Sequence, residues 1–449
     1  MNNDHKTASS SSSPPPGTLR REVGVFGAVM MGLGSIVGTG VFVSIGIAAG
    51  VAGPAVVLAI AVAAIVATCN GLSSAQLAAN CPVSGGTYEY GYRWLSPRLG
   101  FTAGWMFLCA KSASAATAAL GFAGYALNLL QLDDQVGRAP VAFAAVILLT
   151  VLLLAGLRRT NAVNIAIVSV TLLALATFVA AGFPAAWQSA GQNLTPLFAP
   201  VSSDHSAITG FLQACALMFV AYTGYGRIAT LGEEITEPRR NIPRAIIVTL
   251  LVSMTLYMAV GAVAIASVGA PALSEATRGE SAPLAMVAAI WKAPAVRVVV
   301  AIGAVTAMVG VLLNLLLGLS RVALAMGRRA DLPPLLGRLN ESTASPTAAV
   351  VFVGLAIAGL TLIGDVKTTW SFSAFTVLIY YSLTNLAALR LNARERLYPK
   401  WIAAVGLVAC AFLAFWVEQQ VWLTGLALIA AGLIWQQMAR RIWQSKRKG

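Results

Sequence analysis

A lysine within a long apolar stretch is the residue of this chain best suited to proton chemistry. Lys111 is the only charged residue between positions 100 and 130, and Cys109, Ser112 and Ser114 flank it. An ammonium group at mid-bilayer depth costs about 3 kcal/mol on insertion scales. Burial also disfavours the charged form of an amine, so Lys111 is a candidate to exchange a proton.

Two further apolar stretches carry glycine motifs that interrupt a helix. The first reads GSIVGTGVF at residues 34–42, and the second reads AYTGYG at residues 221–226. Glycine is a poor helix former, and a helix broken at membrane depth persists only against protein or a cavity. The half-helix after a break presents N–H groups to anions, and freed carbonyls face cations, so the two motifs predict a site for a zwitterion. The competing interpretation is close helix packing through small residues.

No other residues are arranged for catalysis or metal binding. No two of the five cysteines have the spacing of a zinc or redox site, and both histidines, His5 and His205, lie outside the predicted spans. A membrane enzyme needs clustered polar residues within its spans, and a channel needs a continuous polar pore. Neither pattern is present in the sequence. We therefore expect a protein that is not an enzyme, with no catalytic residue, no metal and no cofactor.

The composition predicts an all-α polytopic membrane protein with twelve transmembrane helices. Of the 449 residues, 58% are hydrophobic and 10% are charged, and apolar runs of about 20 residues recur along the chain. The predicted spans are residues 25–49, 54–78, 100–130, 140–157, 162–183, 208–231, 243–268, 295–322, 346–364, 370–391, 400–417 and 421–437.

The two glycine motifs lie in the first and the sixth of these spans. An offset of five spans reverses the membrane orientation, so spans 1 to 5 and 6 to 10 are expected to form two inverted repeats, the layout of a secondary transporter. The expected units are a disordered cytoplasmic tail at residues 1–22, the repeats at 23–183 and 208–391, spans 11 and 12 at 400–437, and a basic cytoplasmic tail at 438–449.

The basic residues predict the orientation of the chain in the membrane. With a cytoplasmic N-terminus, most of the 30 Lys and Arg residues fall on the cytoplasmic side, which is the usual bias of membrane proteins. Both termini are then cytoplasmic, in a multi-pass protein of the cell (inner) membrane. The net charge of +14 reflects this topology, so nucleic acid is not an expected partner. Lys446, Arg447 and Lys448 suit anionic lipid of the bilayer.

Four segments resemble the amino acid-polyamine-organocation (APC) superfamily, close to bacterial relatives of the cationic amino acid transporter family. They are residues 34–42, 82–88, 219–244 and 320–333, within a resemblance that covers about residues 20–395. The resemblance implies the five-plus-five inverted-repeat fold of the leucine transporter type, with two extra C-terminal helices. It also implies alternating access, in which spans 1, 2, 6 and 7 rock against spans 3, 4, 8 and 9.

The resemblance further implies how an amino acid substrate is held. Backbone N–H groups would bind its carboxylate, and backbone carbonyls would bind its ammonium. The residues implied for the carboxylate are Val37, Gly38, Thr39 and Gly40, and those implied for the ammonium are Ile36, Phe219 and Ala221. Phe219 would also close over the substrate as a lid, and Tyr222 and Gly224 complete the expected substrate-binding set.

The chain departs from these relatives at the position that commonly couples transport to protons. They carry a lysine in span 5, where residues 170–172 of this chain read VTL. Our hypothesis is that Lys111 supplies this ammonium from span 3, so that its deprotonation couples proton movement to rocking. The alternative is a fixed ammonium that is bonded to helix carbonyls, joins spans 1 and 3, and serves a uniporter or exchanger. Sodium coupling is disfavoured, because a lysine repels a cation and span 8 offers only Thr306 and Asn314 as oxygen donors.

Charged residues that follow the second motif predict a cytoplasmic gate. Arg227 is expected to face the cytoplasm and to pair with Glu233 or Glu234. A cation near the pocket argues against cationic substrates, which favours neutral amino acids. Arg328, Arg329 and Asp331 are expected to form a cytoplasmic salt-bridge patch after span 8, which would gate the inner exit or simply be part of a solvated loop.

These observations predict a secondary active amino acid transporter. The expected activity is proton-coupled uptake of small or neutral amino acids, with the amino acid, the proton and the lipid bilayer as partners. Two alternatives stay open. One is an exchanger or uniporter, which includes transport of cationic amino acids or polyamines, and the other is a substrate-sensing receptor of the same fold.

Overall fold

The computed structural model describes residues 23–81, 85–132, 136–156, 161–199, 201, 206–230, 235–280, 282–340 and 345–445. Glu233 and Glu234 of the expected gate lie outside the described residues, as do the expected N-terminal tail and the last four residues. The described chain is helical between short connections, and one isolated parallel bridge joins Val23 to Ile235.

Sixteen α-helices form the described chain, and a π-helix, η1 (Gly40–Ser44), and three 3-10 turns, η2 (Gly53–Ala55), η3 (Thr223–Tyr225) and η4 (Pro334–Gly337), connect some of them. The α-helices are α1 (Val25–Ile36), α2 (Ile45–Ala52), α3 (Val56–Asn80), α4 (Thr87–Trp94), α5 (Pro97–Leu130), α6 (Arg138–Leu154), α7 (Asn161–Asn193), α8 (Ala207–Tyr222), α9 (Gly226–Thr230), α10 (Pro238–Glu280), α11 (Pro283–Ile290), α12 (Pro294–Arg328), α13 (Thr347–Ile363), α14 (Val366–Leu389), α15 (Lys400–Ala414) and α16 (Gln419–Ser445).

Many of these helices have the length and composition of membrane spans. Eight helical segments of the described chain are long and apolar enough to cross a membrane, and α6, α13 and α15 are shorter apolar helices. The first of the eight, Val25–Asn80, has 56 residues and contains two of the expected spans. Backbone N–H and C=O groups inside a regular helix form hydrogen bonds within that helix, as the hydrocarbon core of a bilayer requires.

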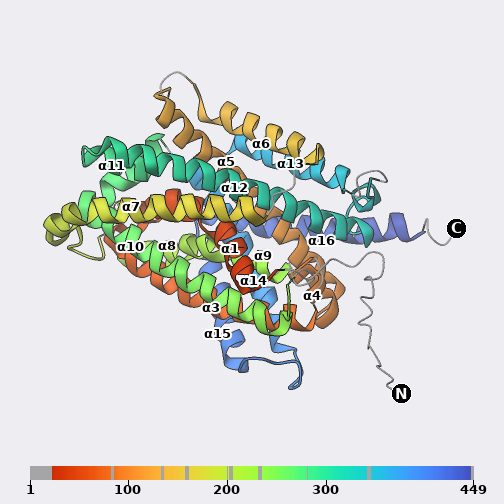
Figure 1. Ribbon diagram of the computed structural model, residues 1–449. Coiled ribbons are helices and arrows are strands. Elements are labelled where there is room, and N and C mark those ends of the chain that lie inside the picture. The colour runs from red at the N-terminus through yellow and green to blue at the C-terminus, as the bar shows by residue number, and fades with distance from the viewer. Residues whose placement is uncertain are drawn as a thin grey trace, which may run out of the picture.

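The long helices run side by side between two ends of the molecule, with α4 at one end and α11 at the other (Figure 1). We call these the α4 end and the α11 end. Helix α5 packs against α12 and α14, and α10 packs against α3 and α7. The start of α5 follows from its sequence, because Ser96 accepts a hydrogen bond from the Leu99 N–H at 3.3 Å and Pro97 occupies the first turn.

Both glycine motifs break their helices and also meet each other. Helix α1 ends at Ile36, after which Val37 is extended (φ −79°, ψ 101°), and α8 ends at Tyr222. A Cβ atom added to Gly40 would lie 2.7 Å from Cβ of Ala221, so the two segments pack at the closest distance that glycine allows. The packing interpretation of the glycines and the broken-helix interpretation therefore both apply.

Several helices continue past the ends that the sequence predicts, among them α7, α10, α12 and α16. Helix α10 runs from Pro238 to Glu280 through a kink at Gly269, whose φ of 80° and ψ of 160° suit glycine. Helix α16 continues to Ser445, so the first part of the expected basic tail is helical. The reason lies at the α4 end, where side chains of α16 contact a buried carboxylate.

That carboxylate belongs to Asp331, which the sequence placed in a solvated patch. Its side chain is 2% exposed, and the hydroxyls of Tyr88 and Tyr92 donate to it at 2.9 and 2.5 Å. Gln436 donates to it at 3.4 Å, and Arg440 lies 3.9 Å away. Burial, followed by the hydrogen bond to Asp331, raises the pKa of Tyr92 to about 12, so this phenol keeps the proton it donates. The prediction of a solvated Asp331 is wrong, because α4 and α16 cover it.

Arg329, another member of the expected patch, has a different partner. It pairs with Glu89 of α4, and its guanidinium lies 4.5 Å from the ring centroid of Tyr92. Together with Asp331, these contacts hold α4 in a fixed position beside the loop of Gly85 and Gly86.

The Asp331 cluster generates a stability prediction. In Asp331→Asn, the amide NH2 would face either the two phenols that donate to Oδ2 or the Gln436 and Arg440 donors at Oδ1, and Arg440 loses its anion in both cases. We therefore expect a loss of about 2–4 kcal/mol and a lower unfolding temperature of the purified protein. Asp365→Asn is the matched control, because Asp365 is an exposed N-cap that accepts from the Thr368 N–H, and asparagine caps a helix equally well. An unchanged unfolding temperature in Asp331→Asn would contradict the assignment.

The contact between the two breaks generates a second stability prediction. A Cβ at Gly224 would overlap the backbone carbonyl of Ser35, which cannot move without displacing α1. We expect Gly224→Ala to cost about 1–3 kcal/mol of stability. Gly359→Ala, in α13 with open space around its Cα, should leave the unfolding temperature unchanged or raise it slightly. Equal unfolding temperatures for the two variants would show that the breaks are not in close contact.

Candidate functional site

A cavity of about 100 Å³ lies where the two breaks meet. Its wall is formed by the breaks themselves and by side chains of α5, α12 and α14. It extends from Thr39 and Ala221 to Gly85 and Gly86, which directly precede α4. The two glycine motifs, nearly 200 positions apart in the sequence, therefore line one cavity.

The residues expected to bind substrate fall into two groups. Those that line the cavity are Ile36, Thr39, Gly40, Ala221 and Gly224. Those that are buried outside its lining are Val37, Gly38, Phe219 and Tyr222. Phe219 packs edge-on against Tyr381 with ring centroids 5.7 Å apart, and the Tyr222 hydroxyl donates to the Ile60 carbonyl at 3.3 Å.

The first break leaves hydrogen-bond donors without backbone partners. The N–H groups of Val41 and Phe42 both donate to the Gly38 carbonyl at 3.1 Å, whereas those of Gly38, Thr39 and Gly40 have no backbone acceptor among the described residues. The Thr39 hydroxyl is buried and has no partner there either. These groups stand at the start of the second half of the helix, where its dipole is positive, so they can hold a carboxylate.

The carbonyls at the ends of the broken helices face side chains of other helices. The Tyr257 hydroxyl of α10 donates to the Ile36 carbonyl at 2.8 Å and lies 3.4 Å from the Ala221 carbonyl. The Asn314 amide of α12 donates to the Gly34 carbonyl at 3.2 Å. The sequence did not single out Tyr257, because one tyrosine in an apolar span gives no signal when its partners are backbone atoms.

The sequence suggests Asn314 only as an oxygen ligand for sodium. Its amide nitrogen instead donates to the Gly34 carbonyl, and it also lies 3.3 Å from the Ser35 hydroxyl. Thr306, the other residue considered, bonds to the Ile302 carbonyl of its own helix at 2.8 Å.

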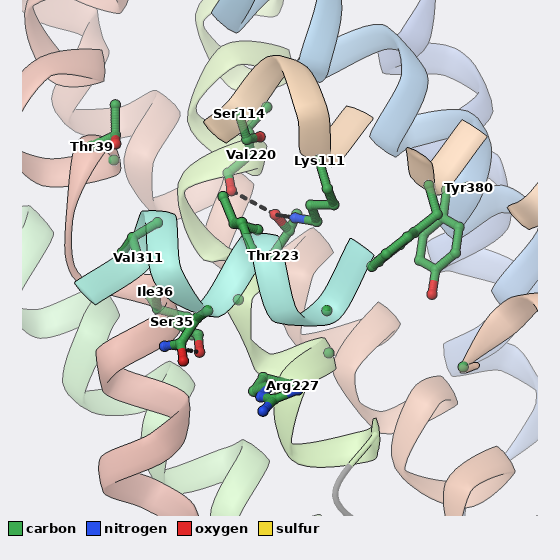
Figure 2. Close-up of a pocket in the computed structure, with 18 of the residues that line it drawn as sticks. Ser35, Ile36, Thr39, Lys111, Ser114, Val220, Thr223, Arg227, Val311 and Tyr380 are labelled. Carbon is green, nitrogen blue, oxygen red and sulfur yellow. Dashed lines mark hydrogen bonds between the residues drawn. The ribbon is translucent and has the colours of Figure 1, made fainter. Parts of the chain in front are cut away.

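Lys111 reaches from α5 to the second break. It is 7% exposed, and its ammonium donates to the Thr223 hydroxyl at 2.7 Å, which donates in turn to the Val220 carbonyl at 2.8 Å (Figure 2). No carboxylate of the described chain forms an ion pair with it. The expectation of carbonyl bonds that join spans 1 and 3 is wrong, because Lys111 contacts a hydroxyl of the sixth span.

The expected gate is only partly described. Arg227 lines the cavity below the breaks in the view of Figure 2, while Glu233 and Glu234 lie outside the described residues. Beyond this gap, Arg240 and Glu237 form an exposed ion pair at 3.8 Å.

A second and larger cavity, of about 830 Å³, lies toward the α11 end. Its charged lining residues are Arg138, Asp365, Lys367, Arg278 and Glu418. Lys367 and Glu418 form an ion pair at 2.5 Å. This second cavity shares no lining residue with the cavity at the breaks.

Comparisons with known proteins agree with this arrangement. The sequence model of the family described as amino acid permease matches residues 27–442. An uncharacterised transporter of Mycobacterium tuberculosis is 38% identical over 418 residues, which are 93% of this chain and 91% of that protein. A branched-chain amino acid permease of Bacillus subtilis is 28% identical over 440 residues, again 93% and 91% of the two chains. A vacuolar cationic amino acid transporter of Arabidopsis thaliana is 26% identical over 368 residues, 78% of this chain and 60% of that one.

The fold is also similar to that of a solved structure. A manganese transporter of Eremococcus coleocola matches with a TM-score of 0.58 at 14% identity, over 93% of this chain and 94% of that one. The family match spans nearly the whole chain, and the cavity lies at the motifs on which the resemblance rests. The chain belongs to the amino acid permease family, whose members are membrane transporters of the APC superfamily.

Proposed function

We propose that this protein is a secondary active transporter that takes up small or neutral amino acids with protons, by alternating access. The observation that carries the proposal is the cavity between the two breaks, with free N–H groups on one side and helix-end carbonyls on the other. These groups complement the carboxylate and the ammonium that every α-amino acid has. Transport of this kind needs no cofactor.

The proposed topology has twelve crossings in two inverted repeats, residues 23–183 and 208–391, followed by two further helices at 400–437. The α4 end is cytoplasmic in this topology, and both termini lie there, in the cell membrane. The cavity continues toward Gly85 and Gly86 at that end, which supports an inward-open arrangement. Arg227, with Glu233 and Glu234, is the proposed gate at this opening.

The walls of the cavity support small or neutral substrates. Beyond the backbone groups, its apolar lining includes Phe107, Val311 and Trp370, and Lys111 is a cation. A buried ammonium opposes a cationic side chain in the same cavity. The Bacillus relative is named for branched-chain amino acids, which favours the same class, whereas the Arabidopsis relative supports cationic amino acids as the second candidate.

Lys111 is the proposed coupling residue. Its hydrogen bond to Thr223 joins α5 to the second break, and a charged donor makes that bond roughly twice as strong as a neutral one. Loss of the proton weakens the contact, so the break and α5 can separate as the helices rock. The alternative is a fixed charge in an exchanger or uniporter, and a receptor that binds without transport would keep the same contact.

A substrate panel tests the proposed function directly. Purified protein in liposomes is offered radiolabelled L-alanine, L-leucine, L-glutamate and L-arginine at two external pH values. We expect faster uptake of L-alanine or L-leucine than of L-arginine, and accumulation against the gradient when the outside is acidic. Preferred uptake of L-arginine would overturn the substrate class, and tight binding without any flux would support a receptor.

The coupling role of Lys111 is tested by substitution. In Lys111→Ala, we expect exchange of internal for external amino acid to continue while an imposed pH gradient no longer drives accumulation. Ser112→Ala is the matched control, because Ser112 is a neighbouring buried residue outside the cavity lining. If Lys111→Ala accumulates substrate at the wild-type rate with the same pH dependence, Lys111 is not the coupling residue.

A further inference from the structure

We infer that Tyr257 is a positioning residue for the substrate ammonium, and that it holds the carbonyls of Ile36 and Ala221 so that both point into the cavity. This inference rests on the proposed function. Tyr257 lies on α10, in neither of the broken spans, and no motif of the sequence includes it.

The geometry places one hydroxyl between two helix ends. The hydroxyl of Tyr257 lies 2.8 Å from the Ile36 carbonyl oxygen and 3.4 Å from that of Ala221. Ile36 is the last residue of α1, and Ala221 is the penultimate residue of α8. Both residues line the cavity, whereas Tyr257 is fully buried and outside the lining. The hydroxyl therefore approaches the two carbonyls from behind the cavity.

Each carbonyl oxygen has two lone pairs, so this contact does not use up its capacity. Ile36 and Ala221 lie where regular helical bonding ends, and two convergent carbonyl dipoles repel each other without a donor between them. The Tyr257 proton offsets that repulsion. An ammonium group in the cavity then meets two acceptors that are already oriented, and it loses less free energy in arranging them.

The phenol is itself held in a fixed position. Its ring packs against Tyr222 with centroids 5.2 Å apart, and the Tyr222 hydroxyl is anchored to the Ile60 carbonyl of α3. Tyr257 is 0% exposed, so water is not available to replace its hydroxyl. Three helices thus fix the donor that aligns the two helix ends.

The test compares substrates with and without the α-ammonium. Inhibition constants are measured in liposomes for L-alanine and L-lactate, and for L-leucine and L-2-hydroxyisocaproate, against uptake of the best substrate of the panel. In Tyr257→Phe, we expect the affinity for both amino acids to fall about tenfold, which is the usual effect when a buried carbonyl loses its hydrogen-bond donor. The affinity for the 2-hydroxy acids should change little. The amino acid to hydroxy acid selectivity then shrinks by the same factor for both pairs.

Tyr125→Phe is the matched control, because Tyr125 is an equally buried phenol that donates to a carbonyl of the same broken span, Phe42, at 2.8 Å. That carbonyl lies within η1, outside the cavity lining, so the selectivity should equal that of the wild type even if less protein folds. Replacement of Tyr257 by 4-aminophenylalanine restores an N–H donor at the same place, and we expect it to restore the selectivity.

Each outcome decides the inference. Unchanged selectivity in Tyr257→Phe would overturn the inference. Tighter binding of L-alanine by this variant would also overturn it, because it would show that the hydroxyl competes with the substrate ammonium for the carbonyls. If Tyr257→Phe does not fold, the 4-aminophenylalanine variant decides, and lost selectivity in the presence of its donor overturns the inference. If the wild type binds and transports no amino acid, the proposed function fails, and this inference fails with it.

Discussion

A backbone broken inside an apolar bundle must find its hydrogen-bond partners there, because no water competes for the freed groups. In this protein the carbonyls around both breaks accept from side chains of helices that are distant in the sequence. The donor and acceptor pairs are Asn314 with Gly34, Tyr257 with Ile36, Tyr125 with Phe42, and Tyr381 with Thr223. Helices α5, α10, α12 and α14 each supply one donor, so the shape of the cavity depends on how these helices sit around the breaks.

The hydrogen-bond donors at the two breaks differ in charge, and this difference suits the two breaks to different roles. The carbonyls around the first break accept from neutral amides and phenols, which keep their protons over the physiological pH range. The second break also contacts an ammonium, Lys111, through the Thr223 hydroxyl. A neutral donor fixes geometry across that pH range, whereas an ammonium can change the strength of its contact. The first break is suited to constant recognition of the amino acid core, and the second is suited to a contact that changes.

At the α4 end, a buried carboxylate likewise finds its hydrogen-bond partners on neighbouring helices. Asp331 is buried, and two phenols, Gln436 and Arg440 surround it, so its charge is compensated by donors from α4 and α16. The last helix of the chain lies outside the proposed repeats, yet it helps to hold the short helix beside the cavity. This explains why α16 remains helical beyond the apolar stretch that the sequence marks as its span.

The sequence by itself determined the helical membrane class, the two glycine motifs and the isolated Lys111. The length of an apolar stretch, the glycines within it and a lysine within it are all local properties of the chain. Only the tertiary structure decided which partners these residues have. Each partner lies in a segment far away in the sequence: Lys111 contacts Thr223, Ile36 contacts Tyr257, and Asp331 contacts the phenols of α4. The contact of Tyr257 uses a backbone carbonyl, which every residue has, so no pattern of side chains can reveal it. The packing of the helices against one another brings these partners together.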